Sequence, residues 1–104
     1  MSGTSAGGVA AYYWSNYVYD KAAHPEGVFI VPDSGIFISD FPSMIDNKTM
    51  TDKTKELLKI ANEQTMMPVS DCVKKYPEME PCFSAGVLSQ FIKPKLFVVQ
   101  SQYD

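Results

Sequence analysis

The feature that most constrains this chain is the glycine-rich segment GTSAGG at residues 3–8. It matches the G-x-S-x-G pattern of a nucleophile elbow, in which a serine lies on a sharp, strained turn between a β-strand and an α-helix. A Cβ atom would collide where such a strand and helix cross, and we expect Gly3 and Gly7 to avoid this collision. The pattern predicts Ser5 as a nucleophile and the Ala6 backbone N–H as an oxyanion-hole donor. The structural alternative is a glycine-rich loop that only turns the chain or caps the helix, because short glycine patterns also arise by chance.

Length and composition limit the classes of protein that remain. A chain of 104 residues forms one domain at most, and its 45% hydrophobic share is typical of a globular protein. A net charge of −3 gives no basic surface for nucleic acid. No apolar run is long enough to span a bilayer, and the N-terminus lacks the basic and apolar regions of a signal peptide. We therefore expect neither a nucleic-acid partner nor a membrane span, and a secretion signal would have to lie outside this sequence.

The segment after the glycines has the spacing of a buried helix, from Ser5 or Ala6 to Tyr19. Tyr13 and Tyr17 share one face of this helix. Tyrosines at helical spacing are usually core or core-edge residues, so we expect the aromatic cluster here to pack rather than to stack on a ligand. The cluster comprises Tyr12, Tyr13, Trp14, Tyr17 and Tyr19.

Two apolar runs predict a parallel sheet. Residues 27–31 (GVFIV) have the composition of a strand buried on both faces, and residues 96–99 (LFVV) that of a second buried strand. A right-handed strand-helix-strand crossover would place Asp33 and Ser34 at the same carboxyl edge of the sheet as Ser5. Both are candidates for a substrate pocket, together with Gly7. Asp and Ser before Gly are also common turn formers, and we give that interpretation more weight.

The single histidine, His24, is the only candidate within the sequence for the base of a Ser-His-acid triad. The length of the predicted helix places it on the order of 25 Å from Ser5, so we expect a solvated histidine near a helix C-terminus instead. Asp104 follows the second apolar run, at the edge where the acid of a hydrolase triad is found. The order Ser5 then Asp104 is the order that α/β-hydrolases use.

The remaining segments are expected to cover the sheet. A helix over residues 52–65, capped by Thr51 or Asp52, carries lysines and glutamates that we interpret as a solvated face. A short helix or turn is expected over residues 83–92. The triplet NKT makes Asn47 a candidate for N-glycosylation, although such triplets are frequent by chance.

The two cysteines, Cys72 and Cys82, enclose a loop with almost no apolar residues. Without histidines nearby they are too few for a zinc site, so they form a disulfide or remain free thiols. A bridge over so short a loop would contribute about 3 kcal/mol in the chain-entropy model. We favour the disulfide, and with it an oxidising compartment. We expect no metal and no cofactor.

Four segments in this order resemble the pectin acetylesterase and Notum family of serine carboxylesterases, and the resemblance spans the whole chain. Residues 3–8 are similar to the family's G-x-S-A-G-G elbow, and residues 33–38 (DSGIFI) are similar to its segment after the next strand. The two cysteines are placed like a family pair, and residues 96–104 resemble the strand and loop that deliver the catalytic acid. The resemblance implies an α/β-hydrolase-like fold with Ser5 as nucleophile and Asp104 as acid. It also implies a secreted enzyme whose ester substrate is an acetylated polysaccharide or, in the Notum branch, an acylated protein.

The sequence departs from the family pattern in ways that affect its activity. The glycine-rich oxyanion loop upstream of the elbow and the triad histidine are absent, and Ile36 stands where an aromatic residue is common. We therefore expect residues 1–104 to be a fragment of a single catalytic domain, running from the elbow to the acid loop. By itself this fragment is expected to be inactive.

Two other interpretations stay open. A patatin-like lipid acyl hydrolase uses a similar G-T-S-A-G elbow with a Ser-Asp dyad and no histidine, and Asp33 would then be the partner of Ser5. The acid of that family is followed by Gly-Gly or Gly-Ala, whereas Asp33 is followed by Ser34. The other interpretation is a non-catalytic fragment or interaction module that keeps the fold without the base.

Overall fold

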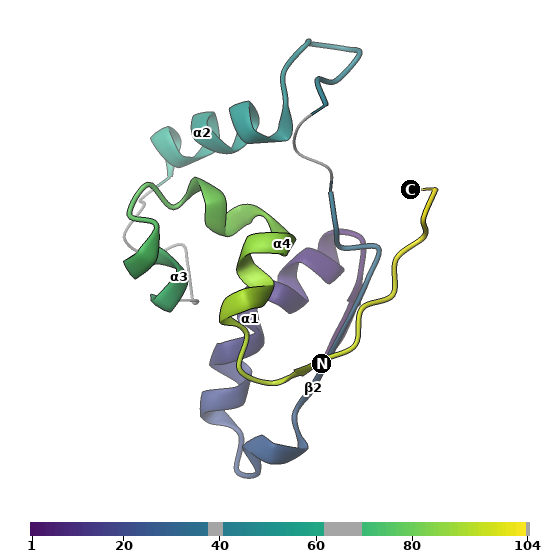
Figure 1. The fold of residues 1–104 in the computed structure, drawn as a ribbon, viewed down its shortest axis with the longest axis vertical. Helices are drawn as coiled ribbons and strands as arrows, with labels where there is room; N and C mark the ends of the chain where they lie inside the picture. The colour runs from purple at the N-terminus through teal and green to yellow at the C-terminus, as the bar shows by residue number, and fades with distance from the viewer. Residues whose placement is uncertain (38–40, 62–69, 104) are drawn as a thin grey trace.

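Three parallel strands, in the order β1-β2-β3, form the sheet of a small α/β domain (Figure 1). The computed structural model describes residues 1–37, 41–61 and 70–103. The parallel pairing of β1 and β2 around a helix agrees with the predicted strand-helix-strand unit. In chain order the elements are β1 (Ser2–Thr4), α1 (Ala6–Lys21), the 3₁₀ turn η1 (Pro25–Gly27), β2 (Phe29–Asp33), α2 (Met50–Ile60), α3 (Ser70–Lys75), η3 (Glu80–Phe83), α4 (Ala85–Leu88), η4 (Ser89–Phe91) and β3 (Lys95–Leu96).

The central strand, β2, continues through Pro32 to Asp33, two residues beyond its predicted end. The Phe97 N–H donates to the Ile30 carbonyl (2.9 Å), and the Val99 N–H donates to the Pro32 carbonyl (3.0 Å). Proline has no N–H with which to return a bond on this side of the strand. For that reason regular pairing with β3 is limited to two residues, although the chain runs alongside β2 for longer.

One face of the sheet is covered by α1, which packs on β1 and β2. The side chains of β2 alternate accordingly, since Ile30 and Pro32 are fully buried whereas Phe29 is 51% exposed. Phe97 and Val99, from the segment that pairs with β2, are 67% and 41% exposed. The prediction of two buried strands is therefore wrong for these residues, because α1 covers only one of the two faces.

The helix predicted after the elbow is confirmed as α1. Its exposed side carries Tyr17 and Trp14, which are 51% and 46% exposed and lie edge to face with ring centroids 5.7 Å apart. The predicted burial of these two rings is wrong, because small residues on the opposite side let the helix approach the sheet and turn the rings outward. The buried residues are Gly8, Ala11, Tyr12, Ser15 and Asn16.

The disulfide favoured from the sequence is confirmed, and it joins two fully buried residues, Cys72 and Cys82. The bridge links α3 to η3 and packs with Tyr12 of α1 and Leu88 of α4 in one hydrophobic cluster. The short helix expected over residues 83–92 is present as α4 and η4. The bridge thus fixes the second half of the described chain against the first helix.

The N-terminus of α2 is capped by Thr49, so the prediction of Thr51 or Asp52 as the cap is wrong. The Thr49 hydroxyl accepts a hydrogen bond from the Asp52 N–H (3.0 Å), and the Asp52 carboxylate accepts one from the Thr49 N–H (3.0 Å). Asp52 resembles a cap in the sequence because it supplies the other half of this capping box. The helix ends at Ile60, so the predicted continuation is wrong at Ala61, whose backbone is extended. Residues 62–65 of the predicted helix lie outside the described ranges. Across the described part of the chain, no helix has the length and apolarity to cross a membrane.

Candidate functional site

Ser5 lies between β1 and α1 with φ 56° and ψ −118°, a conformation that residues other than glycine rarely adopt. Two backbone hydrogen bonds hold it there. Its N–H donates to the Asp33 carbonyl (2.9 Å), and its carbonyl accepts from the Val9 N–H (3.1 Å). A serine that precedes a helix usually caps it with its hydroxyl, but the Ser5 side chain makes no such bond. The exposed hydroxyl is therefore presented at the carboxyl edge of the sheet.

Direct backbone contact between the elbow and the loop after β2 fixes this turn. A Cβ atom on Gly3 would lie 2.1 Å from the Gly7 carbonyl oxygen, which confirms the steric role predicted for Gly3. Gly8 and Gly35 meet backbone to backbone, since a Cβ on Gly35 would lie 2.7 Å from the Gly8 carbonyl carbon. The same role predicted for Gly7 is wrong, because a Cβ there meets nothing within 4 Å. The helix is rotated so that Gly8, and not Gly7, faces the sheet.

Ala6 occupies the first position of α1, beside Ser5. The first N–H groups of a helix have no acceptor within the helix and form the positive end of its dipole. An anionic oxygen that develops next to Ser5 would meet this N–H. The geometry suits the oxyanion role expected for Ala6, which stays a prediction.

Asp33 and Ser34 lie at the same edge of the sheet as Ser5, where the predicted crossover places them. The Ser34 hydroxyl donates to the Asp33 carboxylate (3.0 Å), and Ser34 itself has a positive φ of 50°. Asp33 acts on Ser5 through its backbone carbonyl rather than through its carboxylate. Neither residue, nor Gly7, lines the groove that opens at Ser5. Their roles as substrate contacts stay predictions.

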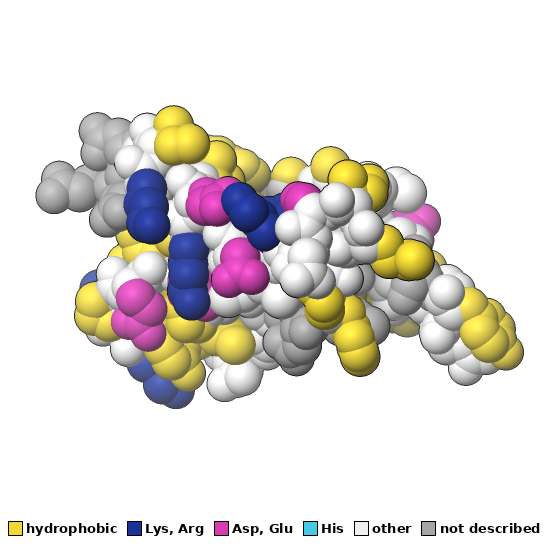
Figure 2. All heavy atoms as spheres, turned by 90° about the horizontal axis from the view of Figure 1, so that it is seen from above, with side chains coloured by type: hydrophobic (Ala, Val, Ile, Leu, Met, Phe, Trp, Pro, Cys, Tyr) yellow, Lys and Arg dark blue, Asp and Glu magenta, His cyan; other side chains and the backbone are white. Residues whose placement is uncertain are grey.

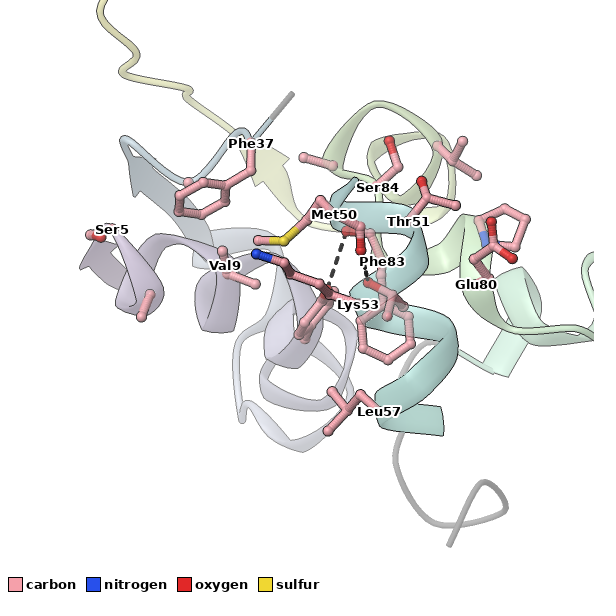
Figure 3. Close-up of a pocket in the computed structure, with 17 residues that line it drawn as sticks. Ser5, Val9, Phe37, Met50, Thr51, Lys53, Leu57, Glu80, Phe83 and Ser84 are labelled. Atoms are coloured by element: carbon pink, nitrogen blue, oxygen red, sulfur yellow. Dashed lines mark hydrogen bonds between the residues drawn. The ribbon is translucent and has the colours of Figure 1, made fainter. Parts of the chain in front are cut away.

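A groove of about 780 Å³ extends from Ser5 between α1, α2 and the segment of η3 and α4 (Figure 3). Its volume and mostly apolar walls suit a small organic ligand. Sequence reasoning missed the walls on α2 and η3, because these residues are distant from Ser5 in the chain. The apolar residues of the amphipathic α2 are the one signal that points to them. The walls comprise Ser5, Ala6, Val9, Tyr13, Gly35, Phe37, Met50, Thr51, Lys53, Thr54, Leu57, Glu80, Pro81, Phe83, Ser84, Ala85 and Val87.

Tyr13 lines the groove as a neutral side chain. Burial raises the pKa of its phenol to about 12. Its hydroxyl donates to the Phe83 carbonyl (3.2 Å), and the two rings pack edge to face with centroids 5.5 Å apart. Tyr13 therefore links α1 to η3 and is not a base at neutral pH.

The other predicted site residues lie apart from the groove or outside the described ranges. His24 lies beyond the C-terminus of α1, with its side chain 87% exposed and its Nδ1 3.5 Å from the Glu26 carboxylate, as expected for a solvated histidine. Asn47 is exposed in the loop before α2, with φ 54°, and its glycosylation stays a prediction. Asp104, the expected acid, is outside the described residues. Within those residues, no group of three His, Cys, Asp or Glu side chains is placed to hold a metal ion.

Ligands of α/β proteins bind at the carboxyl edge of the parallel sheet, and this is the edge at which Ser5 lies and the groove opens. The sequence matches the pectinacetylesterase family over residues 1–104, and the chain belongs to that family, which confirms the resemblance. The family is one of carboxylic ester hydrolases, and its members are generally secreted or extracellular, in keeping with the disulfide. Comparison with curated proteins and with solved structures found no match.

Proposed function

We propose that the chain carries the nucleophile of a serine carboxylesterase with an α/β-hydrolase-like fold. The backbone of Ser5 is the observation that carries the proposal. A strained residue at a strand-to-helix turn persists only where its surroundings hold it, and such strain is concentrated at active sites. The family assignment supports ester hydrolysis. The proposed substrate is an ester of an acetylated polysaccharide or of an acylated protein.

In this proposal the Ser5 hydroxyl attacks the ester carbonyl carbon while a base accepts its proton. The Ala6 N–H stabilises the negative charge that develops on the carbonyl oxygen, assisted by the dipole of α1. The tetrahedral adduct then collapses, the alcohol leaves with a proton from the base, and the acyl group remains on Ser5. Water activated by the same base attacks the acyl-enzyme, releases the acid and restores the hydroxyl.

The base in this mechanism is not His24, whose exposed side chain lies beyond the opposite end of α1. We assign the role to a histidine outside the sequence printed here, with Asp104 as the acid that orients it. Residues 1–104 would then form a portion of one catalytic domain. Without the histidine, the portion retains only the catalysis that comes from binding and the oxyanion donors.

A Ser-Asp dyad of the patatin type is less consistent with this site. Asp33 reaches Ser5 through its carbonyl oxygen, and its carboxylate accepts a hydrogen bond from the adjacent Ser34 hydroxyl (3.0 Å). The match to the pectinacetylesterase family also favours an esterase over a non-catalytic module.

Hydrolysis of 4-nitrophenyl acetate and labelling with a fluorophosphonate test the proposal on a protein that contains residues 1–104 together with the proposed histidine. An activated serine reacts with the fluorophosphonate, and peptide mass spectrometry should locate the adduct on Ser5. Ser5→Ala should lower kcat/KM by at least about a thousandfold, and Ser2→Ala, an exposed serine of β1, should leave it nearly unchanged. An adduct on another residue, or full activity in Ser5→Ala, would contradict the proposal.

A further inference from the structure

Lys53 is the one cationic side chain among the described residues that line the groove. It lies on α2, and its side chain extends into the groove with the ammonium directed toward the side where Ser5 and Val9 lie (Figure 3). Met50 and Leu57 line the groove from the same helix. This side of α2 is therefore turned toward the groove, and it includes Lys53, which the sequence led us to place on a solvated face of the helix.

The anionic wall residue, Glu80, lies at the other end of the groove from Ser5 (Figure 3). Its carboxylate is 3.3 Å from the Lys55 ammonium, and its side chain is 23% exposed. The charge of Glu80 is thus already balanced by a cation. Of the two charged wall residues, Lys53 is the one directed toward the side where Ser5 lies.

The present partner of Lys53 is Asp46, whose carboxylate lies 3.0 Å from the ammonium. Asp46 does not line the groove, and the two side chains are 42% and 39% exposed. Lysine and acidic side chains of α2 and of the loop before it lie together on the surface, where solvent reaches such ion pairs (Figure 2). Ion pairs that are this exposed contribute little and exchange partners readily. A carboxylate that enters the groove can therefore replace Asp46 as the partner of Lys53.

We propose that Lys53 is a specificity-determining residue, which binds a carboxylate carried by the substrate and so selects anionic esters over neutral esters of the same shape. The inference rests on the proposed function in taking an ester as the ligand. Bonds between an ammonium and a carboxylate are shorter and stronger than bonds between neutral groups, and apolar walls strengthen them further. The same walls favour a ligand whose remaining body is apolar or planar.

Two probes of the same shape, 4-acetoxybenzoate and 4-acetoxybenzamide, differ by one negative charge and test the inference by calorimetric titration. Ser5→Ala protein binds them without turnover, and it should bind the anion roughly tenfold more tightly than the amide. Adding Lys53→Met should remove this preference, whereas Lys53→Arg should keep it. Lys59→Met is the matched control, since Lys59 is an exposed lysine of the same helix that does not line the groove. Asp46→Asn should increase the preference by removing the competing carboxylate.

Binding and hydrolysis separate the two proposals. If a protein that contains residues 1–104 and the proposed histidine hydrolyses neither probe, but the preference is present and depends on Lys53, the proposed function fails and the role of Lys53 stands. A preference that survives Lys53→Met, or that Lys59→Met removes to the same extent, overturns the role of Lys53. A protein that binds both probes equally, or binds neither, overturns it as well.

Discussion

Alanine at Gly7 and alanine at Gly8 should change the stability of the protein in opposite directions, although the two glycines are adjacent in the first turn of α1. In Gly8→Ala the new Cβ would lie 2.7 Å from the Asp33 carbonyl oxygen and 3.0 Å from the Gly35 Cα. Both neighbours are backbone atoms, so the helix or the loop has to shift, at a cost of about 1–3 kcal/mol for overpacking. Replacing glycine within a helix returns about 0.5–1 kcal/mol of this. Because backbone atoms cannot move aside by changing rotamer, we expect a cost in the upper half of its range, about 2–3 kcal/mol, and with about 1 kcal/mol returned the net loss is about 1–2 kcal/mol.

In Gly7→Ala the new Cβ meets nothing within 4 Å, and no described glycine has a positive φ. Only the gain from lower backbone entropy in the unfolded chain remains, about 0.5 kcal/mol. Thermal unfolding followed by circular dichroism would measure both variants against the wild type. For a domain of this size each kcal/mol shifts Tm by about 4–8 °C, so Gly8→Ala should melt roughly 5–15 °C lower and Gly7→Ala slightly higher. Equal shifts, or a larger loss for Gly7→Ala, would refute the placement of α1 with Gly8 against the sheet.

Three further measurements test other parts of the structure. Replacing Cys72 and Cys82 by serine should lower the free energy of unfolding by roughly 2–4 kcal/mol in urea titrations, and a reductant should do the same to the wild type but not to the variant. Hydrogen bonds from the Thr49 backbone N–H, the larger effect, and from the Thr49 hydroxyl lower the pKa of Asp52. The stability that this carboxylate adds is therefore complete above its unfolded pKa, and it is lost as the pH falls through the lowered folded pKa. Thr49→Ala should therefore reduce stability by about 1 kcal/mol at neutral pH and weaken its acid dependence. Burial raises the pKa of Tyr13 from 10.0 to about 12. The stability that depends on its neutral phenol is therefore present below pH 10.0 and is lost as the pH approaches 12. An ultraviolet absorbance titration of the wild type against Tyr13→Phe would measure the pKa of this phenol.

The sequence predicts those parts of the fold that depend on the residues of one continuous segment. The spacing of α1 and the presence of two cysteines in an otherwise polar loop are local features, and both predictions are confirmed. The burial of a side chain, by contrast, depends on residues that are distant in the sequence. Tyr13 and Tyr17 have the same helical spacing, yet Tyr13 is covered by Phe83, a residue 70 positions further along the chain, and Tyr17 is not. No pattern within the helix distinguishes the two tyrosines.

The same limit applies to the site. Ser5 can be identified because its motif is contiguous, whereas the groove is assembled from helices and loops that meet only in the folded chain. From the sequence, Lys53 and Lys59 are both assigned to a solvated face of α2. The packing of α2 across the groove makes one of them a wall residue and leaves the other in solvent.

The contact between Gly8 and Gly35 also has a consequence for motion. Methyl groups and exposed side chains rotate on the picosecond to nanosecond timescale, and a contact made through side chains retains some of this torsional freedom. Two backbones in direct contact contain no side-chain torsion, so the first turn of α1 can move relative to β2 only as far as the sheet itself deforms. Amide order parameters at residues 3–8 should then be about 0.85, the value of rigid backbone, instead of the lower values of a glycine-rich loop. A serine held in this way is aligned before the ligand arrives, and binding requires no further loss of entropy to order it.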